Sequence, residues 1–131
     1  MLTLIRHGWG RPDSPFMKAF ASIFMPEASR AQIDSMAALQ NLTTSPANAA
    51  ALRGAIDRFS VTGLLGKVAA PTLVLHARED GVQPLGQGRE LAAGIPAAEF
   101  VMLETSSHIV VPGDRAWAAM IGAIERFVAE A

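Results

Sequence analysis

The feature that most constrains the fold is a pair of short apolar runs, each followed by a polar turn. The first run covers Thr72–Leu75, and the turn after it carries Asp80. The second covers Phe100–Leu103, and the turn after it carries His108. Short apolar runs bounded by turn residues are typical of parallel strands buried on both faces. The interval between Asp80 and His108 leaves room for one helix and one strand.

The chain after Pro71 is therefore expected to alternate strand, helix, strand and helix. We predict strands at Thr72–His76 and Glu99–Leu103, with a helix over residues 85–94 between them. Parallel strands joined through a helix form a right-handed βαβ unit. A closing helix over residues 114–129 is indicated by apolar residues at helical spacing: Trp117, Met120, Ile121, Ile124, Phe127 and Val128.

Residues 1–66 instead predict helices. Their start signals are Asp13 or Ser14 before Pro15, then Ser29, and then Ser45 before Pro46. A short helical turn is expected around residues 64–65. The apolar stripes expected to face inward are Phe16, Phe20, Ile23 and Phe24, then Ile33, Met36, Ala37 and Leu39, then Ala49, Leu52, Ile56 and Phe59.

Composition narrows the class of protein. The chain has 131 residues, half of them apolar and 18% charged, which favours one folded domain with a real core over disorder. The net charge of −1 argues against a protein that binds nucleic acid or membrane surfaces directly. No run approaches the roughly 18 apolar residues of a membrane span. The absence of cysteine excludes disulfides and thiol chemistry and fits a cytoplasmic protein.

Asp80 and His108 are the candidate catalytic residues. Each follows the carboxyl end of a predicted strand, which is where the active sites of open α/β sheets lie. A carboxylate at that edge can hold an imidazole in one tautomer, and the imidazole can then act as a general base. The alternatives are ordinary turn chemistry for Asp80 and a backbone-bonded loop histidine. His76, at a strand end, is interpreted as structural.

Three other patterns bear on function. His7, His76, His108 and Asp80 lack any recognised spacing of metal ligands, so no metal is predicted. Gly86-x-Gly88 lacks the third glycine of a dinucleotide site, so no cofactor is predicted. Residues 1–8 resemble the strand-Arg-His-Gly opening of histidine phosphatases, with His108 as a second histidine, but the characteristic arginine cluster is missing.

Residues 71–112 resemble the last two strands of the α/β-hydrolase superfamily. The resemblance implies that Asp80 and His108 are the acid and base of a catalytic triad, which follow the serine in that fold. The chain contains no Gly-x-Ser-x-Gly, so the nucleophile is absent. Residues 71–112 depart from the superfamily's usual pattern at Ala77 and Ser107. The matching residues are Pro71–His76, Asp80, Pro84, Gly88–Ala93, Ile95–Pro96 and His108.

Residues 8–70 look like the cap region of hydrolase-like domains that are attached to helix-turn-helix regulators and nucleotide cyclases. The similar stretches are Gly8–Gly10, Phe24–Ala28 and Leu42–Pro46. Together the two resemblances imply a single domain over residues 1–131, with a cap-like part (1–66) and a C-terminal βαβα part (67–131). The chain would then be the C-terminal half of such a domain, as a fragment or as a truncated gene product.

Two functions follow from this interpretation. The first is a catalytically incomplete domain that senses a small apolar ligand or mediates interactions in a regulatory protein. The alternative is part of an active ester or carbon–carbon-bond hydrolase whose serine lies in missing sequence. A homodimer is expected in either case, because a two-stranded sheet is marginal alone and its apolar edge would be open.

Overall fold

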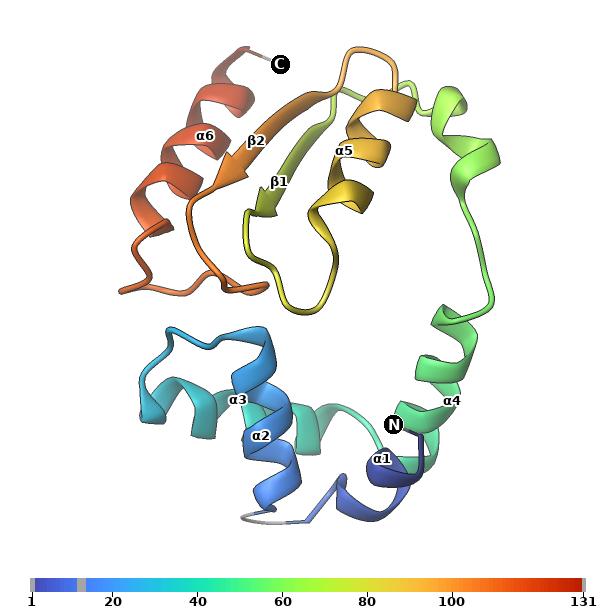
Figure 1. Cartoon of the computed structure of the whole chain (residues 1–131), viewed down its shortest axis with the longest axis vertical. Coiled ribbons are helices and arrows are strands. Elements are labelled where there is room, and N and C mark those ends of the chain that lie inside the picture. Colours follow the sequence, from blue (N-terminus) through green and yellow to red (C-terminus); the bar gives the residue numbers. More distant parts are fainter. Residues whose placement is uncertain (1, 12–13, 131) are drawn as a thin grey trace. The chain divides into compact units, whose positions relative to one another are not determined.

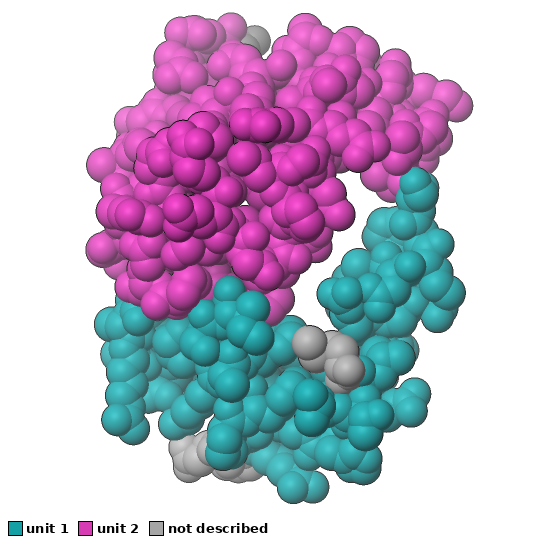
Figure 2. All heavy atoms as spheres, viewed as in Figure 1, with its two compact units in different colours: residues 1–23, 28–60 teal, residues 24–27, 61–131 magenta. Residues whose placement is uncertain are grey.

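A computed structural model describes residues 2–11 and 14–130 of the chain. The chain divides into two compact units: unit 1 comprises residues 1–23 and 28–60, and unit 2 comprises residues 24–27 and 61–131 (Figure 2). The prediction of one domain over residues 1–131 stays a prediction. No helix within the described residues has the length and apolar character needed to cross a membrane.

Unit 1 is helical, as predicted. Its helices are α1 (Leu2–Gly8), α2 (Pro15–Phe24, whose last residue belongs to unit 2), α3 (Arg30–Thr43) and α4 (Pro46–Ile56) (Figure 1).

Two of the three predicted start signals are confirmed as helix caps. The Ser29 hydroxyl accepts a hydrogen bond from the Gln32 N–H at 3.3 Å, and the Gln32 side chain accepts one from the Ser29 N–H at 2.8 Å. Ser45 accepts from the Asn48 N–H at 3.2 Å. At the third start, Ser14 donates its hydroxyl to the Gly8 carbonyl at 2.9 Å instead, and Asp13 lies outside the described residues.

The core of unit 1 shows which helix faces turn inward. It consists of Ile5, Trp9, Met17, Ala37, Ala49 and Ala50, with Phe16 and Phe20 packed against it. The predicted stripe of α4 is wrong beyond Ala49, because Leu52 and Ile56 are 61% and 43% exposed and Phe59, just past the helix, is 65% exposed. Two adjacent alanines form the buried side of α4, which packs against α1.

The other stripes are only partly confirmed. In α2 the most buried positions are Met17 and Ala21, while Phe16 and Phe20 are half-buried and Ile23 is exposed. In α3 Ala37 is buried and Leu39 is exposed. Small residues on these helices allow close approach, so the larger neighbours lie at the margins of the core.

Unit 2 is the predicted α/β part. Strands β1 (Leu73–Ala77) and β2 (Glu99–Leu103) pair in parallel, with Leu73 opposite Glu99 and Ala77 opposite Leu103. The connection between them contains α5 (Leu85–Gly94), and α6 (Trp117–Glu130) follows β2 (Figure 1). A 3₁₀ helix, η1 (Thr62–Lys67), precedes β1 at the predicted turn. The predicted fold class, helical residues followed by two parallel strands in one sheet, is confirmed.

The strands are less buried than the sequence suggests. Only their last residues, Ala77 and Leu103, are fully buried, and the others are half-buried. The described sheet has two strands, so each strand has one open edge. Both α5 and α6 pack on the two strands, and the two helices do not contact each other.

Candidate active site

The backbone pairing of β1 with β2 continues past both strand ends. The Arg78 N–H donates to the Leu103 carbonyl at 2.9 Å, and the Glu79 N–H donates to the Thr105 carbonyl at 3.2 Å. Parallel strands end at the same edge of a sheet, so the turns after them lie side by side. This extension places Asp80 beside the loop that carries His108.

Asp80 and His108 are hydrogen-bonded, as the sequence predicts for the pair. The distance from His108 Nδ1 to Asp80 Oδ2 is 2.7 Å. The other carboxylate oxygen accepts from the N–H groups of Val82, at 2.7 Å, and Gln83, at 2.9 Å. The Asp80 side chain is only 3% exposed, whereas the His108 side chain is 33% exposed. The carboxylate is therefore fixed, and the imidazole is accessible.

The surroundings of Asp80 favour its ionised form. Burial alone would raise the pKa of this carboxyl. The backbone N–H of Gln83, the imidazole of His108 and the backbone N–H of Val82 outweigh burial and lower the pKa below its ordinary value of 3.8. An ionised carboxylate only accepts hydrogen bonds, so His108 donates from Nδ1. In the neutral imidazole, Nε2 then carries the lone pair that a general base needs.

Sequence relatives match only part of the chain. No profile of a known protein family matches it. A putative carbamate hydrolase RutD of Pseudomonas syringae pv. syringae (strain B728a) is 37% identical over 54 residues, which is 41% of this chain and 21% of that protein. Non-heme chloroperoxidase CPO-A1 of Kitasatospora aureofaciens is 42% identical over 66 residues, which is 46% of this chain and 24% of that protein.

Solved structures match nearly the whole chain. A hydrolase from Pseudomonas aeruginosa PA01 superposes with a TM-score of 0.75 at 20% identity, over 97% of this chain and 47% of that one. This chain has part of an α/β-hydrolase fold. An enol-lactonase from Burkholderia xenovorans LB400 superposes with a TM-score of 0.69 at 21% identity, over 98% of this chain and 48% of that one. The chain thus spans about half the length of these solved structures. Its matches to the curated relatives cover less than a quarter of their length.

Within this hydrolase fold, the other candidate residues do not join Asp80 and His108. His76 lies in β1 with Nδ1 2.9 Å from the Ala77 carbonyl oxygen, and its ring lies against Gly88, so its interpretation as a packing residue fits. Gly86 and Gly88 lie within α5. Among residues 2–11 and 14–130, no cluster of three or more His, Asp or Glu side chains could hold a metal.

The phosphatase alternative finds no support in the local structure. It requires a strand before the Arg-His-Gly sequence, but residues 2–8 form helix α1. His7 belongs to this helix.

Sequence reasoning missed two residues beside His108. The ring of Phe24 meets the His108 ring edge-on, with centroids 5.5 Å apart and planes at 72°. Glu27 accepts a hydrogen bond from the Ser106 hydroxyl at 3.0 Å. Both lie about 80 residues earlier in the chain. Both residues belong to the stretch Phe24–Ala28, which resembles a cap region. No sequence pattern links that stretch to the loop that carries His108.

Proposed function

We propose that this chain supplies the acid and the base of an α/β-hydrolase catalytic site and is catalytically incomplete by itself. The observation that carries the proposal is the 2.7 Å hydrogen bond between His108 and the buried Asp80. No Gly-x-Ser-x-Gly occurs in the 131 residues. The nucleophile and the oxyanion hole would therefore come from polypeptide outside this sequence.

The chemistry follows from the orientation of His108. Its Nε2 would take the proton of a serine hydroxyl as the serine oxygen bonds to the carbonyl carbon of a substrate. Asp80 would stabilise the imidazolium, which then returns the proton to the leaving group. Carbonyl compounds such as esters, or substrates cleaved at a carbon–carbon bond, are the proposed class. The fold neighbours named as a hydrolase and an enol-lactonase support this choice.

The tautomer of His108 tests the proposal. In the isolated chain, imidazole ¹⁵N shifts measured by NMR at pH 8 are expected to show the Nδ1–H tautomer of His108. The Asp80→Ala variant is expected to show the Nε2–H tautomer that free imidazole side chains favour, because the acceptor is gone. His7, in unit 1, is the internal control and keeps its tautomer in both proteins. An Nε2–H tautomer in the parent protein would contradict the proposed pair.

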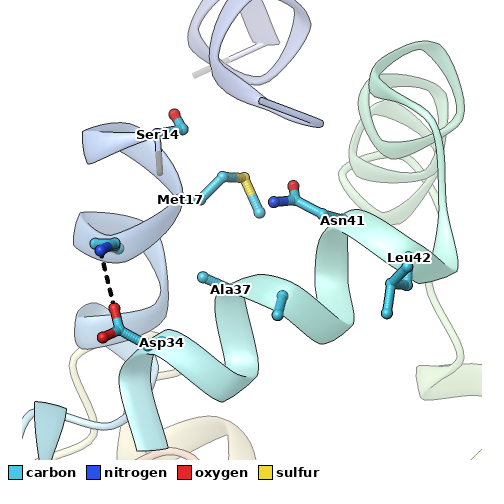
Figure 3. A pocket seen from close by; sticks show the side chains of 8 residues that line it. Ser14, Met17, Asp34, Ala37, Asn41 and Leu42 are labelled. Atoms are coloured by element: carbon cyan, nitrogen blue, oxygen red, sulfur yellow. Dashed lines mark ion pairs between the residues drawn. The ribbon is translucent and has the colours of Figure 1, made fainter. Parts of the chain in front are cut away.

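A specific observation also favours the ligand-sensing role. Unit 1 contains an open cavity of about 460 Å³ between α2 and α3 (Figure 3). Met17 and Ala37 form an apolar wall, and an ion pair of 3.0 Å between Lys18 and Asp34 lies at one end. This lining suits a small, mostly apolar molecule with one polar group. The complete lining is Ser14, Met17, Lys18, Asp34, Ala37, Ala38, Asn41 and Leu42.

Benzyl alcohol is a suitable probe of that cavity. It is expected to raise the unfolding temperature of the chain, because a molecule that binds only the folded state stabilises it. Ala38→Leu, which narrows the cavity, is expected to abolish the increase. Ala51→Leu on α4, outside the lining, is the matched control and keeps it. An increase of equal size in the parent and in Ala38→Leu would contradict binding at this place.

The expected homodimer is proposed to form through the open edge of β1. The helical Phe and Met side chains are a weaker candidate interface, because Met17, Phe16 and Phe20 pack in or against the core of their own unit. Unpaired backbone groups along an apolar edge strand favour pairing with a second copy. Sedimentation equilibrium at micromolar concentration is expected to give twice the chain mass of 13.8 kDa. A stable monomer would contradict this expectation.

A further inference from the structure

The segment Phe24–Glu27 contacts the His108 loop on the C-terminal side of the histidine. The Ile109 N–H donates to the Phe24 carbonyl at 2.9 Å. The side chain of the same Phe24 meets the His108 ring edge-on. One residue therefore binds the backbone next to His108 and also touches the ring itself. Met25, the next residue, is 2% exposed, and the whole segment belongs to unit 2.

Glu27 contacts the same loop on the N-terminal side of the histidine. Its Oε1 accepts from the Ser106 hydroxyl at 3.0 Å, and the Ser106 N–H and the Thr105 hydroxyl oxygen lie 3.4 Å from it. The Arg115 guanidinium lies 3.2 Å from the same oxygen. A carboxylate that binds several donors in one loop restricts that loop more than a single neutral bond would.

We propose that residues Phe24–Glu27 form a clamp that positions the imidazole of His108. Asp80 fixes one ring nitrogen but leaves the ring free to rotate about that hydrogen bond. Phe24 restricts that rotation, and Glu27 holds the loop from which the side chain projects. Phe24 and Glu27 are thus positioning residues, and this inference rests on the proposed role of Asp80 and His108.

The loop keeps other contacts when the clamp is removed. The Thr105 hydroxyl donates to Asp114 Oδ2 at 3.0 Å, and the Ser107 N–H donates to the Thr105 hydroxyl oxygen at 3.1 Å. The Asp114 Oδ1 accepts from the Ala116 N–H at 2.8 Å. Loss of Glu27 should therefore loosen the loop without unfolding unit 2.

The test compares Glu27→Ala, Glu27→Gln and Phe24→Leu in the full chain. Glu27→Ala is expected to increase the amide exchange rate of Ile109 about tenfold, because it frees the loop for local opening. It is also expected to reduce the Nδ1–H fraction of His108 at pH 8. Glu27→Gln restores both readouts, because its amide oxygen can still accept from Ser106. Phe24→Leu reduces the Nδ1–H fraction and keeps the backbone bond to Ile109.

Glu104→Ala is the matched control. Glu104 is a carboxylate that follows β2 directly, and it pairs with Arg78 rather than with the His108 loop. Glu104→Ala should change neither the amide exchange rate of Ile109 nor the Nδ1–H fraction of His108. If it changes them as much as Glu27→Ala does, general destabilisation explains the result and the clamp is overturned. If the parent shows the Nδ1–H tautomer and neither Glu27→Ala nor Phe24→Leu changes it, the clamp alone is overturned. If the parent lacks that tautomer, both the proposed acid–base pair and the clamp are overturned.

Discussion

The purified chain is expected to hydrolyse p-nitrophenyl esters no faster than its His108→Ala variant. Acyl transfer in this fold needs a serine on a strained elbow and backbone donors for the developing oxyanion. Loss of a single triad member typically lowers the rate by several orders of magnitude. A spectrophotometric assay over a range of ester concentrations measures the effect.

Four of the serines are engaged in other ways. Ser29 and Ser45 cap helices, Ser14 donates to the Gly8 carbonyl, and Ser106 donates to Glu27. Ser107 is buried, and it immediately precedes His108 in the sequence. Saturable turnover that disappears in His108→Ala would show that one of these hydroxyls, or a second copy of the chain, provides a nucleophile. That result would contradict the proposed incompleteness.

Gly88→Ala is expected to destabilise the chain, although alanine is the better helix former. A Cβ built on Gly88 would lie 2.4 Å from Cδ2 and 2.8 Å from Cγ of His76. The ring cannot retreat easily, because its Cβ is also only 3.1 Å away. Overpacking of this kind costs about 1–3 kcal/mol. Urea unfolding followed by circular dichroism measures the change in the free energy of unfolding.

Gly86→Ala is the matched control for this prediction. Gly86 lies in the same helix, and a Cβ there would meet nothing within 4 Å. Replacing glycine by alanine in an open helical position stabilises by up to about 1 kcal/mol. The two variants should therefore change stability in opposite directions. Equal stabilisation by both would mean that α5 does not pack on β1 through Gly88 and His76.

The order of the residues is enough to predict the local elements and the contact between Asp80 and His108. Ser29 and Ser45 indicate helix starts because their hydroxyls can satisfy the free N–H groups of a first turn. The apolar runs before Asp80 and His108 indicate strands of the same direction. Parallel strands end at one edge of a sheet, so the meeting of these two side chains followed from sequence order alone.

Which helix faces are buried depends on tertiary packing and could not be predicted from the sequence. The stripe that includes Leu52 and Ile56 has the period of an inward face, yet both residues are exposed. The helical spacing of apolar residues indicates that a helix has an apolar face. It does not show whether the face that carries alanines or the face that carries leucines is buried. The choice depends on how closely the neighbour can approach, and here Ala49 and Ala50 face inward on the side that packs against α1.

Only the tertiary structure brought Phe24 and Glu27 to His108. Nothing in local propensity links these residues to a loop about 80 positions later. Hydrogen bonds from Ser106 to Glu27 and from Ile109 to Phe24 join this segment to the His108 loop within unit 2. Contacts between distant segments depend on how the chain packs as a whole, whereas the Asp80–His108 pair needs only two adjacent strands.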